Sequence, residues 1–168
     1  MNLILVDKKN RARGFASKEK CHQDSGLLHR AFTAFIINNK KQILIQKRSK
    51  YKKLWPLSWE ASFSSHPGKG ENNLQAVKKR IKYELGLQCQ LKKKGRFYYQ
   101  VSYKNIGAEH ELCDVFVGAC EGKIKINSKE VVAIKWVGAN ELKKDIAKNP
   151  KKYAPWLKPA LKYVWAKK

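Results

Sequence analysis

The chain has 168 residues, enough for one domain with a proper hydrophobic core, and we expect residues 1–168 to form a single domain. Its 37 Lys and Arg against 13 Asp and Glu give a formal net charge of +24, which favours an anionic partner: nucleic acid, an anionic membrane or an acidic small molecule. No apolar run is long enough to span a bilayer, and the N-terminus lacks the basic start and small-residue cleavage site of a secretory signal, so we expect neither a membrane span nor secretion.

The first part of the chain predicts short strands separated by irregular segments. Residues 14–20 form a polar stretch, and 21–26 are expected to be a loop because Asp-Ser-Gly interrupts any helix. Asn38-Asn39 is typical of a hairpin turn, and 51–59 is predicted to be a loop. The expected strands, rich in β-branched and aromatic residues, are 2–6, 29–37, 41–48 and 60–64.

The second part predicts one central helix, several strands and two late helices. The central helix has apolar residues at helical spacing and ends at Gly86, a good C-terminal breaker. Its apolar positions are Leu74, Val77, Ile81 and Leu85. Two strand candidates lie within 88–103, two more strands cover 110–120 and 131–137, and helices are expected over 141–148 and 155–165. This mixture favours an α/β sandwich with a mixed sheet.

The four cysteines show no CxxC pairing. They are Cys21, Cys89, Cys113 and Cys120. The sequence therefore predicts reduced thiols in a cytoplasmic protein.

Histidines and glutamates suggest a metal site as one of two interpretations. Glu109 and Glu111 are two apart on a predicted strand, so their carboxylates point to one face while His110 points to the other. Two carboxylates this close repel unless a cation or a shared proton lies between them. With His22, His29 and His66 they form a set of five that suits six-coordinate Mn²⁺ or Mg²⁺, and Zn²⁺ less naturally. Spacing alone favours the other interpretation, hydrogen-bonded histidines and an exposed strand edge.

The central helix offers a second pair of charges. Arg80 and Glu84 are one turn apart and project from the same face. Such a pair suits a phosphate held through a divalent metal, or it is an ordinary surface salt bridge. The residues alone favour the salt bridge.

Several motifs in the same order resemble one known family. They are LLHRAF at 27–32 preceded by His22, QKRSKYKKLWPLSW at 46–59, SSHP at 64–67, KYELG at 82–86, AEHELC at 108–113 and PWL at 155–157. Together they closely resemble type 1 isopentenyl diphosphate isomerase over roughly residues 14–157. The resemblance implies a Nudix-like α/β/α sandwich with a mixed β-sheet, a divalent metal, and conversion of isopentenyl to dimethylallyl diphosphate.

The resemblance also implies roles for individual residues. The tightly bound metal, Mn²⁺, Zn²⁺ or Mg²⁺, would be held by His22, His29, His66, Glu109 and Glu111, and Glu84 would help to bind a Mg²⁺ that arrives with the diphosphate. The substrate-binding residues would be Lys18, Arg48, Lys52 and Arg80 around the diphosphate and Trp156 at the carbon end. The catalytic positions would be Ser64, Glu111 and Tyr99. Moving a double bond requires one proton to be added and another removed, so two acid/base groups must flank the hydrocarbon.

One position departs from the family. Ser64 stands two residues before His66-Pro67, where the family has a cysteine that acts as the second acid/base group. A hydroxyl is far harder to ionise than a thiol, whose pKa is about 8.5. We therefore predict retained substrate binding with reduced isomerase activity, and the alternative is a diphosphate-binding protein that no longer isomerises.

Two other functions compete with the isomerase. A Nudix hydrolase needs an Arg-Glu pair and a Glu-Glu pair on the central helix, where this chain has Lys79-Arg80 and Tyr83-Glu84, with Glu71 alone upstream. An RNA-binding module would exploit the net charge, but no RRM-like or KH-like signature is present, so nucleic acid is not the expected partner. The oligomeric state and the metal used in the cell stay open, with a monomer among the options.

Overall fold

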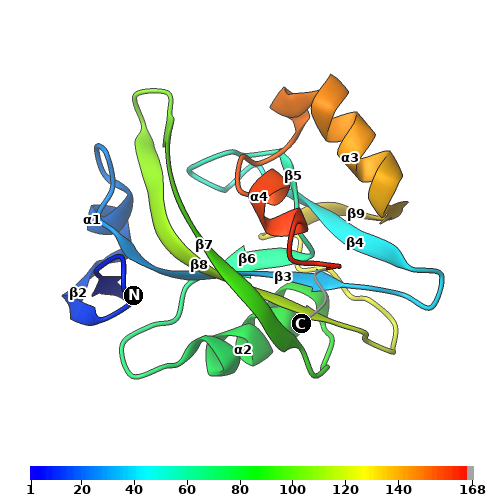
Figure 1. Ribbon diagram of the computed structural model, residues 1–168, viewed down its shortest axis with the longest axis horizontal. Coiled ribbons are helices and arrows are strands. Elements are labelled where there is room, and N and C mark those ends of the chain that lie inside the picture. The colour runs from blue at the N-terminus through cyan, green and yellow to red at the C-terminus, as the bar shows by residue number, and fades with distance from the viewer. Residues whose placement is uncertain (166–168) are drawn as a thin grey trace.

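The computed structural model describes residues 1–165 (Figure 1). The strands are β1 (Asn2–Val6), β2 (Ala12–Ser17), β3 (His29–Ile36), β4 (Gln42–Arg48), β5 (Trp59–Glu60), β6 (Phe63–Ser65), β7 (Lys92–Tyr103), β8 (Gly107–Gly118) and β9 (Val131–Gly138). The helices are α1 (Lys18–His22), α2 (Asn73–Leu85), α3 (Ala139–Lys148) and α4 (Leu157–Leu161), with a 3-10 turn η1 (Pro150–Lys152). No helix in the described part of the chain is long and apolar enough to cross a membrane.

The strands form two sheets. The larger has the order β2-β1-β3-β8-β7, with β6 also paired to β3, and the smaller has the order β5-β4-β9. β3 and β8 run parallel while the other pairs are antiparallel, so the predicted mixed sheet is confirmed. In the parallel pair His29 lies opposite Glu111, which brings two segments 82 positions apart into contact at the site described below.

Helices cover both faces of the strands, as Figure 1 shows, with α2 below and α3 and α4 above. Side chains alternate along β3, so Phe32 and Ile36 pack in the core on the α2 side of the sheet while Phe35 packs in the core on the side of α3 and α4. From the helices, Ile81 of α2 and Leu142 of α3 fill these two cores. The predicted α/β/α sandwich is therefore confirmed.

The ends of α2 follow from local sequence. The Asn72 side chain accepts a hydrogen bond from the Gln75 backbone while the Gln75 side chain accepts one from the Asn72 backbone, which satisfies two helix-start donors. Gly86 ends the helix with a φ of 68°, a left-handed conformation that glycine adopts at little cost. The predicted end of the helix is confirmed.

Five local predictions were wrong. The single strand expected over 60–64 is two short strands, β5 and β6, because each pairs with a different sheet. Residues 14–20 are not irregular, because β2 gains its hydrogen bonds from β1 without needing an apolar pattern, and Ser17 then caps α1. Helix α1 also continues into the expected loop as far as His22. The two strand candidates within 88–103 form one strand, β7, because β8 pairs with it along its length. The last helix, α4, is shorter than the predicted range 155–165.

The prediction of four reduced cysteines was also wrong. Cys89, after α2, and Cys120, after β8, form a disulfide across a sequence separation of 31 residues. Only the fold brings these two segments together, and no local spacing motif signals the pair. Cys21 and Cys113 are free and buried.

Candidate active site

Three histidines and two glutamates meet at one place, and we call them the His/Glu cluster. One potential ligand atom from each lies within 4.8 Å of the others. His22 ends α1, His29 begins β3, His66 follows β6, and Glu109 and Glu111 share one face of β8. As predicted, His110 faces away from the cluster, with its Nδ1 2.9 Å from the Gly26 carbonyl oxygen.

Backbone carbonyls set the orientation of two of the imidazole rings. His22 Nδ1 lies 2.7 Å from the Lys18 carbonyl oxygen, and His29 Nδ1 lies 2.7 Å from that of Leu27. A carbonyl only accepts, so each Nδ1 carries the proton and donates. In the neutral ring each Nε2 then presents a lone pair to the cluster, as in metal-binding histidines.

Unpaired atoms inside the cluster fit a divalent cation. His29 Nε2 and Glu109 Oε2 are buried without a hydrogen-bond partner among the described residues. Glu109 Oε2 lies 3.0 Å from His22 Nε2, but in the neutral ring both atoms present lone pairs. Buried polar atoms nearly always have a partner, and a bound cation would supply one to all three. The donor set of nitrogens and carboxylate oxygens therefore suits a divalent metal.

The pKa shifts keep two of these groups in the deprotonated state that metal binding requires. Burial, together with the nearby rings of His29 and His22, holds the pKa of His66 well below its usual value. Burial alone would raise the pKa of Glu111, but attraction to His29 and the hydrogen bond from Tyr99 lower it. For His22, burial lowers the pKa but is outweighed by the negative charge of Glu109, whose Oε2 lies 3.0 Å from its Nε2, so the pKa is raised in the absence of a metal.

A cavity of about 430 Å³ opens against the cluster. Its lining includes most of the predicted site residues: Lys18, His22, Arg48, Lys52, Ser64, His66, Arg80, Tyr99, Glu109, Glu111 and Trp156. Two predicted residues do not line it. His29 is the fully buried member of the cluster, and Glu84 is fully buried with its carboxylate accepting a hydrogen bond from Arg80.

Basic side chains crowd one part of this cavity. Arg80 and Lys52 both donate to Glu130, which sequence reasoning missed because no motif surrounds it. Burial and repulsion by Lys52 and Arg80 lower the pKa of Lys18. We call Lys18, Lys52 and Arg80 the cationic wall of the cavity. A bound anion would relieve the repulsion among them, so this wall is suited to a phosphate-bearing ligand.

Aromatic rings line another part. The Tyr99 hydroxyl donates to Glu111 Oε2 at 2.6 Å, and burial and the Glu111 charge raise its pKa well above normal, so it stays protonated. The Trp156 ring lies 6.2 Å from that of Tyr99 and 5.5 Å from that of Trp55, measured between centroids. Ring faces of this kind can stabilise a carbocation or an organic cation.

Ser64 lies on β6 and lines the same cavity. Its hydroxyl is 2.8 Å from that of Thr33, directly opposite on β3. The serine that stands in place of the family's cysteine therefore lies within the site and not on a distant surface.

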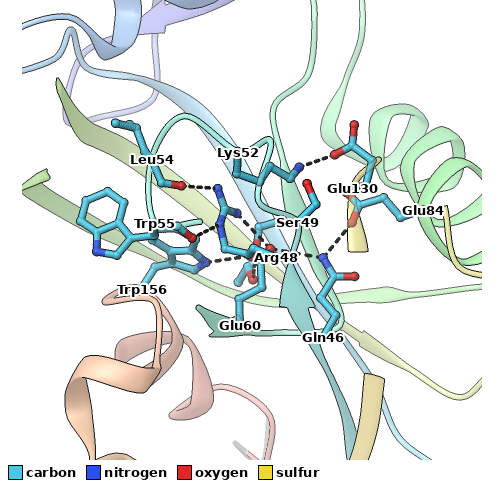
Figure 2. A network of polar contacts seen from close by, with 12 residues as sticks. Gln46, Arg48, Ser49, Lys52, Leu54, Trp55, Glu60, Glu84, Glu130 and Trp156 are labelled. Carbon is cyan, nitrogen blue, oxygen red and sulfur yellow. Dashed lines mark hydrogen bonds and ion pairs between the residues drawn. The ribbon is translucent and has the colours of Figure 1, made fainter. Parts of the chain in front are cut away.

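Three hydrogen bonds hold the guanidinium of Arg48 in place (Figure 2). It donates to the backbone carbonyls of Trp55 and Leu54, each at 2.9 Å, and to Glu60 at 3.0 Å. Glu60 is another residue that sequence reasoning missed, since it is a single acid in a short strand.

Comparison with known proteins places this site in a family. The model of the NUDIX domain matches residues 27–157. A crystal structure from Deinococcus radiodurans superposes with a TM-score of 0.81 at 16% identity, covering 99% of this chain and 100% of that one. A MutT NUDIX hydrolase from Burkholderia pseudomallei superposes with a TM-score of 0.65 at 19% identity, covering 82% of this chain and 98% of that one. These likenesses establish a Nudix fold.

Curated relatives narrow the assignment. Isopentenyl-diphosphate Delta-isomerase 1 of Photorhabdus laumondii is 38% identical over 94% of this chain and 90% of its own length. Isopentenyl-diphosphate Delta-isomerase 2 of Aromatoleum aromaticum is 35% identical over 96% of this chain and 85% of its own length. The chain therefore belongs to the type 1 isopentenyl-diphosphate Delta-isomerases of the Nudix superfamily.

Proposed function

We propose that this chain converts isopentenyl diphosphate to dimethylallyl diphosphate. The observation that carries the proposal is a single cavity lined by cluster residues, by basic side chains and by aromatic rings. The His/Glu cluster would hold one divalent ion, Mn²⁺, Zn²⁺ or Mg²⁺, and Glu84 would help to hold a Mg²⁺ that enters with the diphosphate. A cytoplasmic location stays a prediction, and the oligomeric state stays open.

The two ends of the substrate have separate needs. The diphosphate is anchored by the basic side chains Lys18, Lys52 and Arg80, which fixes the hydrocarbon relative to the acid/base groups. The rings of Tyr99 and Trp156 exclude water from the carbon end and present their faces to the developing tertiary cation.

The chemical step is a pair of proton transfers. One proton is added to the terminal carbon of the double bond and another leaves the carbon on the other side of the branch, so the charge returns to its starting value. Glu111 moves one of these protons, and the hydrogen bond from Tyr99 to its Oε2 holds the carboxylate in place. When bound, the divalent ion supplies positive charge that favours the ionised form of both cluster carboxylates.

Ser64 is the weak element of this mechanism. Its hydroxyl pairs with that of Thr33 and is a poor proton donor or acceptor at neutral pH. Reduced turnover follows from this substitution. The same observation favours the second candidate function, a diphosphate-binding protein without isomerase activity.

Hydrolysis of nucleoside diphosphate compounds fits the site less well. Glu71 lies before α2 and is occupied by the side chain of Lys79 and the backbone N–H of Gly68, and α2 itself carries one acid, Glu84. The helix therefore lacks the dense set of free carboxylates that a hydrolytic Mg²⁺ centre needs.

The test is a direct assay with labelled isopentenyl diphosphate and Mg²⁺. We expect slow formation of labelled dimethylallyl diphosphate that stops when chelator is added. Binding of substrate without any product would favour the second candidate. Release of phosphate from a nucleoside diphosphate compound, with no isomerisation, would replace the proposal with a hydrolase.

A further inference from the structure

Glu60 is a buried acid for which the resemblance assigns no role. It lies on β5, and only 1% of its surface is exposed. Burying a carboxylate is costly unless charges and hydrogen-bond donors surround it. Three donors do so here: Gln46 Nε2 at 3.2 Å, Arg48 Nη1 at 3.0 Å and Trp156 Nε1 at 3.1 Å.

The two oxygens of Glu60 divide their contacts between a basic and an aromatic side chain that both line the cavity. Oε1 accepts from Arg48, and Oε2 accepts from the indole N–H of Trp156, as Figure 2 shows. Arg48 also lies over the Trp156 ring, with its guanidinium carbon 5.1 Å from the ring centroid. One carboxylate therefore sets the relative position of a basic group and an aromatic group that line the same cavity.

A second path leads from Glu60 toward α2. Gln46 Nε2 donates to Oε1 of Glu60 and also to Oε2 of Glu84, the latter at 2.7 Å. Glu84 in turn accepts from Arg80. Hydrogen bonds thus connect the indole of Trp156 with the buried carboxylate behind the cationic wall.

We propose that Glu60 is a positioning residue that orients the Trp156 indole at the carbon end of the cavity. This inference rests on the proposed function, because it assigns Trp156 to the hydrocarbon of the substrate. Rotation of the Trp156 indole is restricted by the hydrogen bond from its ring nitrogen to Glu60 and by the Arg48 guanidinium over its face. A ring held in advance needs no reorganisation when the substrate cation forms.

The test uses two variants that remove the contact from opposite sides. Glu60→Gln keeps the shape but offers a single acceptor oxygen, so it cannot pair with both Arg48 and Trp156. Trp156→Phe keeps an aromatic ring and lacks the N–H. We expect each variant to lower kcat about tenfold, and the double variant to be no slower than either single variant, because both changes break the same contact.

A readout independent of activity comes from the indole N–H signals of protein labelled with ¹⁵N-tryptophan. The chain has five tryptophans, and the signal lost in Trp156→Phe identifies the one of interest. We expect that signal to shift and to exchange faster with solvent in Glu60→Gln. The matched control is Asp114→Asn, which removes a buried carboxylate paired with Lys93 and Arg96 away from the cavity. It should leave both kcat and the indole signal unchanged.

The outcomes separate this inference from the proposed function. An unmoved indole signal in Glu60→Gln, or kcat losses that multiply in the double variant, would overturn the positioning role. If Glu60→Gln does not fold, a wild-type kcat in Trp156→Phe would overturn it as well. Absence of turnover in the wild type together with a shifted indole signal would refute the isomerase function and leave the Glu60 contact supported.

Discussion

Replacing Ser64 with cysteine should raise the turnover of this chain. The substitution exchanges a hydroxyl for a slightly larger thiol at a half-buried position on the wall of a cavity of about 430 Å³, so there is room for the added sulfur. A competent general acid or base contributes typically 10²- to 10⁴-fold. The Thr33 hydroxyl, which lies 2.8 Å from the Ser64 hydroxyl, would compete with the substrate for the hydrogen bond of the new thiol. We therefore expect a gain at the low end of this range, about a hundredfold in kcat. That gain corresponds to about 2.7 kcal/mol of activation free energy.

The assay follows labelled isopentenyl diphosphate with the wild type and Ser64→Cys side by side. The KM should change little, because the basic residues that anchor the diphosphate are untouched. Cys21 and Cys113 are buried and the other two cysteines are paired, so iodoacetamide should inactivate Ser64→Cys far faster than the wild type. Ser102→Cys, which places a thiol at an exposed position of β7 that does not line the cavity, is the control: it should react with iodoacetamide without loss of activity. Normal substrate binding by Ser64→Cys with unchanged turnover would refute the reasoning.

Three further predictions concern the His/Glu cluster. Glu111→Gln should abolish the remaining isomerase activity, and undiminished product formation would remove this residue from the acid/base role. Gly107→Ala should lower the metal content measured by elemental analysis, because the new methyl carbon would lie 2.2 Å from the His22 carbonyl oxygen. Gly138→Ala is the control and should leave the metal content unchanged, because its φ of −67° is ordinary and its new methyl carbon would meet nothing closer than 4.0 Å. The purified wild type should hold about one divalent ion per chain, and chelation should lower its Tm, since a ligand at a hundred times its Kd stabilises by about 2.7 kcal/mol. An unchanged Tm in a metal-free sample would argue against a metal in the cluster.

The sequence predicted the fold well where side-chain pattern decides the structure. The apolar run of β3 and the spacing along α2 both signal burial, and they form the two cores around Phe35 and Ile81. It failed where backbone pairing decides, as in β2, whose exposed residues carry no pattern and gain their structure from β1. The disulfide between Cys89 and Cys120 is a contact of the same non-local kind.

The candidate site shows the same division. The cluster could be anticipated because histidine and paired glutamate are conspicuous residue types, and the family motifs supplied the grouping. The sequence could not single out Glu60, Gln46 and Glu130, because an isolated polar residue in a buried strand or a loop looks like any other until its partners are known. Their partners lie between 12 and 96 positions away in the sequence.

The site also explains why the net charge of +24 is a poor guide to function. The two carboxylates of the cluster carry the opposite charge to a divalent ion, so metal binding leaves that part of the cavity close to neutral. The recognition of an anion then depends on a few basic side chains that line the cavity, such as Lys18, whose pKa is lowered by burial and by the neighbouring cations. Bound phosphate oxygens would relieve that local repulsion, whereas lysines scattered elsewhere are screened by salt within about 10 Å. Selectivity for a diphosphate attached to a short hydrocarbon is therefore set by the arrangement of charges and rings in one cavity, and not by the composition of the chain.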